Sequence, residues 1–144
     1  MFKKVLIANR GAIAVRITRT LHELGIKSVA VYAPSDRDSL HVEVADEIYP
    51  LASDRVQESY LDQNRLIEIA KEAGAEAIHP GYGFLSENAE FAERLSENDM
   101  TFIGPKPSHL RSFGLKHEAR AIAEATGVNL LPGSGVLKDE GEAI

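Results

Sequence analysis

Short apolar runs alternate along this chain with longer stretches in which apolar residues recur every three or four positions. The first run occupies residues 5–8, and the apolar residues after it fall on one helical face: Ile13, Ile17, Leu21 and Leu24. Gly25 follows this face, where the C-terminal glycine of a helix is expected. A continuous apolar run with a crossover helix behind it is typical of a strand in a parallel sheet. The opening of the chain therefore predicts a βα unit.

The same alternation predicts further strands and helices along the chain. Strands are expected at residues 28–32, 47–51, 77–79 and 101–103. Helical segments are expected as a brief turn at 41–45, from a cap at Asp62 to Gly74, over 89–95, and from Leu115 to Gly127. Repeated βα units indicate an α/β fold with a Rossmann-like, mostly parallel sheet flanked by helices.

The last part of the sequence contains a turn or hinge signal, Pro132-Gly133-Ser134-Gly135. Residues 138–144 then resemble the beginning of an amphipathic helix. Because a protein rarely ends where such an element opens, we expect the chain to be the front piece of a longer protein.

Composition narrows the class of protein. With 144 residues, 44% of them hydrophobic, the chain is long enough to bury a core of its own. A net charge of −6 argues against binding to nucleic acid or to an anionic membrane surface, since both need clustered Lys and Arg. The absence of cysteine excludes disulfides, thiolate metal sites and a Cys nucleophile. No apolar run is long enough to span a bilayer, and the apolar N-terminus stops too early for a signal peptide. We therefore expect a soluble protein of the cytoplasm or an organelle matrix.

The most informative local motif is the run HPGYGFLSEN at residues 79–88, which joins an expected strand to an expected helix. Its glycines permit a tight turn and close approach of a ligand to the backbone, and Ser86 or Asn88 can cap the helix that follows. In open α/β sheets, ligands bind at strand-loop-helix junctions of this kind. A structural turn without a ligand is an equally acceptable interpretation of the motif alone.

The loop after the first strand does not fit a dinucleotide site. It reads Asn9-Arg10-Gly11, with one glycine where the dinucleotide fingerprint has three, and no acidic residue closes the second strand. A nicotinamide enzyme is therefore disfavoured. Gly11 can still expose backbone amides to a ligand at the start of the next helix, although a packing role fits equally well.

Charged residues on two expected helices allow more than one role. Arg16, Arg19 and Glu23 lie opposite the apolar face of the first helix, where Arg19 and Glu23 either pair on a solvated surface or contribute to a subunit interface. Lys116 lies in the first turn of its helix, where the helix dipole disfavours a cation. A nucleotide phosphate would reverse that balance, because an ammonium and helix amides can share one anion. A solvated surface lysine is the alternative.

The chain holds no complete catalytic set. Its five histidines, at positions 22, 41, 79, 109 and 117, show no metal-ligand spacing, so no metal site is predicted. Ser86 lacks the Gly-x-Ser-x-Gly context of a nucleophile elbow. The residues alone thus indicate an α/β domain with a candidate anion or nucleotide edge.

Several segments together resemble the N-terminal domain of the biotin carboxylase component of biotin-dependent carboxylases. The most specific are VLIANRGAIAVR at residues 5–16, AIHPGYGFLSENAEFAE at 77–93 and FIGP at 102–105. The resemblance covers nearly the whole chain and implies an ATP-grasp enzyme whose pre-ATP-grasp domain spans 1–112, with 113–144 as a linking helix and the beginning of the ATP-grasp domain. Such enzymes use ATP and Mg²⁺ to activate bicarbonate as carboxyphosphate, and then carboxylate biotin attached to a carrier.

The resemblance also assigns roles to individual residues. Lys116 matches the lysine that contacts the ATP phosphates, and Tyr82 and Gly83 match the loop that borders the biotin site. Arg19 and Glu23 match positions of a homodimer interface. Nothing in this chain matches the Mg²⁺ ligands of the family or its residues that handle bicarbonate. We therefore expect the isolated chain to be inactive.

The final carboxyl acceptor is a separate question. FGLKHEAR at 113–120, followed by NLLPG at 129–133, is more similar to urea carboxylases, including urea amidolyases, and to guanidine carboxylases than to acyl-CoA or pyruvate carboxylases. We therefore expect urea or guanidine as the acceptor. Ala12 departs from the family pattern, which usually has Glu there. Alternatives are an acyl-CoA or pyruvate carboxylase, a non-catalytic dimerisation or binding module, and another ATP-grasp ligase such as a carbamoyl-phosphate or purine-pathway enzyme.

Overall fold

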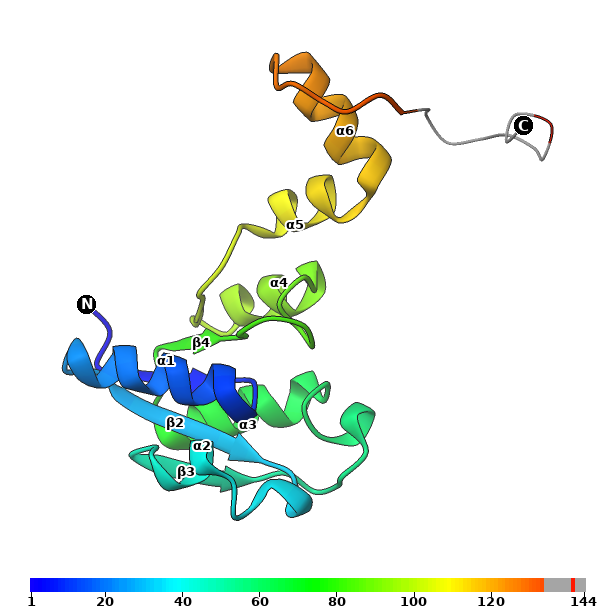
Figure 1. The fold of residues 1–144 in the computed structure, drawn as a ribbon. Helices are drawn as coiled ribbons and strands as arrows, with labels where there is room; N and C mark the ends of the chain where they lie inside the picture. The colour runs from blue at the N-terminus through cyan, green and yellow to red at the C-terminus, as the bar shows by residue number, and fades with distance from the viewer. Residues whose placement is uncertain (134–140, 142–144) are drawn as a thin grey trace. The chain divides into compact units, whose positions relative to one another are not determined.

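The structure is a computed structural model that describes residues 1–133 and 141 (Figure 1). The chain divides into two compact units, Met1–Pro107 and Ser108–Ile144. The predicted turn at 132–135 continues beyond the described residues, and the predicted helical start at 138–144 lies outside them except for residue 141.

Five parallel strands form the sheet in the described part of the first unit. They are β1 (Lys4–Ile7), β2 (Lys27–Tyr32), β3 (Glu47–Pro50), β4 (Ala77–His79) and β5 (Thr101–Phe102). Their order is β3-β2-β1-β4-β5, and every neighbouring pair is parallel. The predicted α/β fold with a mostly parallel sheet is thus confirmed, and each predicted strand is present within one residue at either end.

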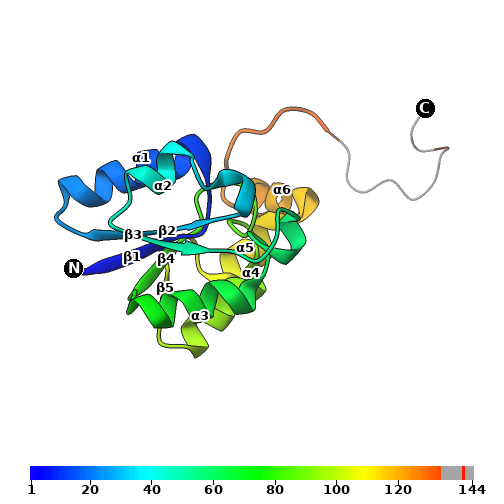
Figure 2. The ribbon, with the colours of Figure 1, turned by 90° about the horizontal axis from the view of Figure 1, so that it is seen from below.

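Helices cover both faces of this sheet. Figure 2 shows α1 (Gly11–Glu23) and the short α2 (Leu40–Glu43) on one face and α3 (Gln63–Ala73) on the other. Successive side chains of β1 pack on opposite faces of the sheet, because side chains alternate in direction along a strand. Leu6 joins the larger core with α3 and α4 (Ala89–Glu97), whereas Val5 and Ile7 join a smaller core with α1.

The predicted helix caps on the second face are confirmed. The side chain of Asp62 accepts a hydrogen bond from the backbone N of Arg65 at 3.1 Å, and Gly74 ends α3 in the left-handed conformation. At α4 the cap is Asn88, whose Oδ1 accepts from the backbone N of Phe91 at 2.8 Å. These caps fix where each helix starts relative to the strand before it.

Two sequence expectations were wrong or incomplete. Leu24, expected on the buried face of α1, is 53% exposed, because α1 ends at Glu23 and Leu24 lies past its last turn. The buried face instead consists of Ala14, Ile17, Thr18 and Leu21. The structure also contains an unpredicted helix, α5 (Pro107–Gly114), whose only buried residue is Leu110.

The second unit contains the helix predicted from Leu115. Helix α6 spans Lys116–Ala125, with Leu115 at its N-cap, and Gly127 follows in the left-handed conformation. Its predicted apolar face is only partly covered, since none of its residues is buried.

Candidate functional site

The candidate site lies at β1, where the order of the strands changes from one side of the sheet to the other. β1 is paired with β2 on one side and with β4 on the other, so the loops that follow β1 and β4 leave the sheet in different directions. Parallel α/β sheets bind ligands outside the carboxyl ends of the strands at such a switch point. An open cavity of about 380 Å³ lies there, lined by Asn9, Arg10, Gly11, Ala12, Ile13, Tyr82, Gly83 and Phe84. The predicted ligand-binding loop thus lines a cavity together with the loop after β1.

Asn9 joins the two loops through its side-chain amide. Its Nδ2 donates to the carbonyl oxygens of Pro80 at 2.7 Å and Tyr82 at 2.9 Å, while its Oδ1 accepts from the backbone N of Arg10 at 2.9 Å. Gly81 lies directly against this amide, since a Cβ on Gly81 would be 2.6 Å from the Asn9 Nδ2 atom. The close approach and a φ of 68° both require glycine at position 81.

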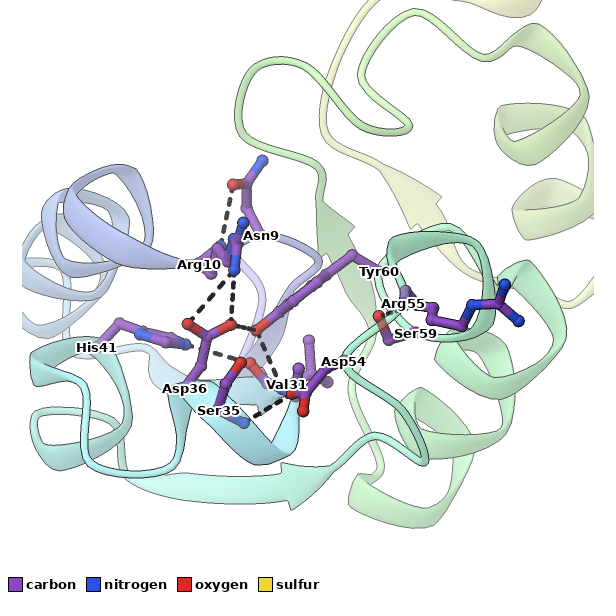
Figure 3. A network of polar contacts seen from close by, with 11 residues as sticks. Asn9, Arg10, Val31, Ser35, Asp36, His41, Asp54, Arg55, Ser59 and Tyr60 are labelled. Atoms are coloured by element: carbon purple, nitrogen blue, oxygen red, sulfur yellow. Dashed lines mark hydrogen bonds and ion pairs between the residues drawn. The ribbon is translucent and has the colours of Figure 1, made fainter.

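Arg10 leads into a polar network below the two loops (Figure 3). Its Nη1 lies 3.0 Å from Oδ2 of Asp36, and the same carboxylate oxygen accepts from the hydroxyl of Tyr60 at 2.7 Å. The backbone N of Ala33 donates to that hydroxyl at 3.1 Å, and the Arg10 guanidinium lies 5.4 Å from the centre of the Tyr60 ring. Asp36 therefore connects the loop after β2 to the loop after β1 and to Tyr60.

Burial keeps Tyr60 neutral within this network. The side chain is 1% exposed, and desolvation raises the pKa of its hydroxyl far above the ordinary value. The hydroxyl therefore remains a donor to Asp36 throughout the physiological range. The ring also stacks on Phe84, with centroids 5.2 Å apart and planes inclined by 2°. The network thus reaches the far end of the loop after β4.

Two histidines near the site are also held neutral. Desolvation lowers the pKa of His79 and of His41. Nδ1 of His79 lies 3.0 Å from the backbone N of Gly81 and accepts its hydrogen, which requires an unprotonated Nδ1. His79 therefore helps to shape the turn and is not a cationic ligand.

Tyr82 and Gly83 form the exposed crest of the loop. The Tyr82 side chain is 69% exposed, Gly83 has a φ of 65°, and Phe84 after it has a φ of 42°. A positive φ outside glycine is uncommon and persists where surrounding contacts hold it. Here the Tyr60 stack and the Asn9 amide supply those contacts.

The other sequence-predicted residues lie elsewhere. Lys116 is the first residue of α6 in the second unit, at the predicted helix start, and it is exposed. Arg19 and Glu23 lie on the exposed side of α1, and among the described residues no ion pair joins them. Arg16 and Arg19 border a second open cavity, of about 520 Å³, next to α2.

A Ser-His-Asp cluster that no motif indicated lies at the opposite end of β2. Oδ2 of Asp46 accepts from the backbone N of Ser28 at 2.8 Å, from its hydroxyl at 2.7 Å, and lies 2.9 Å from Nε2 of His22. Burial alone would raise the pKa of Asp46, but these hydrogen bonds outweigh it and lower the pKa to about 2. Because Ser28 is fully buried and shares one carboxylate oxygen with His22, the cluster is structural and holds no nucleophile.

The described residues contain no group of three or more His, Cys, Asp or Glu side chains that could hold a metal ion. Within the same residues no helix is both long and apolar enough to cross a membrane.

Comparison with known proteins identifies related families. The family described as "Biotin carboxylase, N-terminal domain" matches residues 1–110. Biotin carboxylase 2 of Bacillus subtilis is 55% identical over 133 residues, which cover 92% of this chain and 30% of that protein. Urea amidolyase of Saccharomyces cerevisiae is 51% identical over 143 residues, which cover 99% of this chain and 8% of that protein. The chain thus spans about a third or less of the length of these relatives.

Solved structures give the same result. The biotin carboxylase domain dimer of the Hydrogenobacter thermophilus 2-oxoglutarate carboxylase, in complex with MgADP, ADP and bicarbonate, has a TM-score of 0.92 at 46% identity, covering 99% of this chain and 32% of that one. The urea carboxylase of Kluyveromyces lactis has a TM-score of 0.88 at 53% identity, covering 91% of this chain and 12% of that one.

Proposed function

The chain belongs to the family of biotin carboxylase N-terminal domains, and on this premise we propose that it forms part of an ATP-dependent biotin carboxylase. The whole enzyme would use ATP, Mg²⁺ and bicarbonate to carboxylate biotin on a carrier domain or protein. Bicarbonate would attack the terminal phosphorus of ATP, giving ADP and carboxyphosphate. The ureido nitrogen of biotin would then take the carboxyl group, with release of phosphate.

The observation that carries this proposal is the cavity at the switch point between β1 and β4. The HPGYGFLSEN motif lines it with Tyr82 and Gly83, and the loop after β1 lines the opposite side. We propose that this cavity borders the biotin ring, with the exposed backbone of Gly83 and the Tyr82 ring available for contact. The cavity is small and partly apolar, as suits a fused bicyclic ring.

Lys116 is proposed to contact the ATP phosphates. Lys116 is the first residue of α6, where the backbone N–H groups of the first turn have no partner within the helix, and a cationic side chain at that position adds to their preference for an anion. Residues 1–112 would then form the pre-ATP-grasp domain, and 113–144 would lead into the ATP-grasp domain, where the remaining nucleotide and Mg²⁺ ligands belong.

Arg19 and Glu23 are proposed to contribute to a homodimer interface. Both are exposed on α1 without an ion pair between them in the described residues, so their charges are available to a second copy. The related 2-oxoglutarate carboxylase domain is a dimer. A cytoplasmic location is proposed on the same family basis.

Urea or guanidine is proposed as the carboxyl acceptor, on the residues at 113–120 and 129–133. Overall identity does not separate the candidates, because biotin carboxylases and urea amidolyases match this chain equally well, at 53% and 53% for one relative of each kind. The acceptor proposal therefore stands on these local segments.

The test is biotin-dependent ATP cleavage by the longest natural protein that carries this chain. The assay contains bicarbonate and offers urea, guanidine or acetyl-CoA separately. Stimulation by urea or guanidine supports the full proposal, whereas stimulation by acetyl-CoA alone keeps the carboxylase and removes the acceptor assignment. A protein that cleaves no ATP in response to biotin would contradict the enzymatic proposal.

A further inference from the structure

We propose that Asn9 is the positioning residue of the Tyr82-Gly83 loop and sets the backbone with which this loop meets biotin. The inference rests on the proposed function, because the loop contacts biotin only if the switch-point cavity is the biotin site. Asn9 acts through the loop: its contacts are to backbone atoms of Pro80 and Tyr82, on either side of Gly81.

The geometry of the Asn9 amide is suited to this task. Both hydrogens of Nδ2 are used, one toward each loop carbonyl at 2.7 and 2.9 Å, and Oδ1 accepts from Arg10 N at 2.9 Å. The residue is 4% exposed, so water does not compete for these groups. Aspartate offers no donor when ionised, and serine offers one donor at shorter reach. Asparagine therefore provides two donors and one acceptor that no small substitute reproduces.

The loop needs such anchors because its sequence alone does not hold one conformation. Gly81 and Gly83 have positive φ, at 68° and 65°, but glycine adopts many other backbone conformations as readily. Phe84 has a φ of 42°, which is unfavourable for a residue with a side chain and persists only when surrounding contacts determine it. At the distal end the contact is the stack of Phe84 on Tyr60, and at the proximal end it is Asn9. The exposed pair Tyr82-Gly83 lies between these two anchors.

Loss of the contacts of Asn9 should therefore raise the KM for biotin and leave the KM for ATP unchanged. In the longest natural protein carrying the chain, we expect Asn9→Asp to raise the KM for free biotin roughly tenfold or more, because two buried carbonyls lose their donor and face a carboxylate. The KM for ATP should remain within about twofold of the wild-type value. A purely structural defect would reduce the amount of active enzyme and leave the ratio of the two KM values unchanged.

The pH dependence supplies a second readout. A protonated aspartate regains one donor, so the biotin KM of Asn9→Asp should fall toward the wild-type value as pH decreases. Asn9→Ser carries no titratable group and should show no such recovery. If Asn9→Asp does not fold, Asn9→Ser is measured in its place, together with hydrogen exchange of the peptide covering residues 80–85, which should exchange faster than in the wild type.

Asn98 provides the matched control. Its Nδ2 also donates to a backbone carbonyl at 2.7 Å, that of Arg94, at the end of α4. Asn98→Asp should change neither KM. Equal changes in both KM values for the Asn9 variants, or an unchanged biotin KM, would overturn the positioning role. Wild-type enzyme without biotin-dependent ATP cleavage would instead overturn the proposed function, so the two failures are distinguishable.

Discussion

The rings of Tyr60 and Phe84 are parallel to within 2° and 5.2 Å apart, although they belong to different segments of the chain. Tyr60 is buried and bound to Asp36, so its ring provides a fixed surface against which Phe84, at the end of the turn, packs. The stack connects the polar network after β2 to the loop after β4. It thereby couples the stability of the core to the shape of the candidate site.

Removing the Tyr60 hydroxyl should destabilise the protein. In Tyr60→Phe, the Asp36 carboxylate and the Ala33 N–H each lose a partner, which should lower the free energy of unfolding by about 1–3 kcal/mol. Urea unfolding measures this difference. Tyr82→Phe is the matched control, because its hydroxyl is on an exposed side chain and its loss should change the free energy by less than about 0.5 kcal/mol. Equal, small effects of the two substitutions would show that the hydrogen bonds of the Tyr60 hydroxyl contribute nothing to stability.

Substituting alanine at Gly81 and at Gly74 separates the cost of a clash with Asn9 from the cost of the left-handed backbone conformation. Both have a positive φ, at 68° and 66°, but a Cβ on Gly74 meets nothing within 4 Å. Gly74→Ala should therefore cost about 1–2 kcal/mol from the left-handed conformation alone. Gly81→Ala should cost more, since its Cβ overlaps the Asn9 amide. Thermal or urea unfolding of the two variants decides the point, and similar losses would contradict the close approach.

Acid should lower the free energy of unfolding in part through protonation of Asp46. Its pKa is lowered from 3.8 to about 2 in the folded state, so protons bind more tightly to the unfolded chain. The contribution is therefore present above about pH 4 and is lost as pH falls through about 2. The free energy of unfolding should decrease less steeply over this range in Asp46→Asn than in the wild type.

Asp38→Asn is the control for this pH experiment, because Asp38 is an exposed carboxylate in the loop after β2. It should leave the slope of the wild type intact. A wild-type slope that Asp46→Asn does not reduce would mean that the Ser28 and His22 contacts do not hold the carboxylate in solution.

The predicted contact with the ATP phosphates depends on Lys116. Lys116→Gln removes the cation at the start of α6 and should raise the KM for ATP roughly tenfold or more, or abolish turnover, because charge-assisted contacts to phosphate contribute about 1.5–3 kcal/mol. Steady-state kinetics of the longest natural protein carrying the chain tests this, with circular dichroism to verify folding. Lys106→Gln, at an exposed loop position, should leave the kinetics unchanged. Normal ATP kinetics in Lys116→Gln would remove the assignment.

Local features of the fold were predictable because they depend on neighbours in the sequence. Apolar runs and helical periods record which face of each element is buried, and Asp62, Asn88 and Gly74 act on the nearest turn of backbone. The specific HPGYGFLSEN motif indicated both the family and the loop that lines the cavity. The prediction that Leu24 is buried was wrong, because the apolar period of α1 continues in the sequence beyond the residue where the helix ends.

Only the tertiary structure decided which residues surround the candidate site. Asn9 contacts Pro80 and Tyr82, which are 71 and 73 positions away, and Tyr60 binds Asp36 across 24 positions. These pairs meet because β1 lies between β2 and β4 in the sheet, so the loops after all three strands converge at one edge. A local pattern shows that a strand is buried, but it carries no information on which strand lies beside it. The sequence by itself thus determined the family, the strands, the helices other than α5, and the loop. Strand order brought Asn9, Arg10, Asp36 and Tyr60 to that loop, because packing and loop closure across the whole chain select which segments become neighbours.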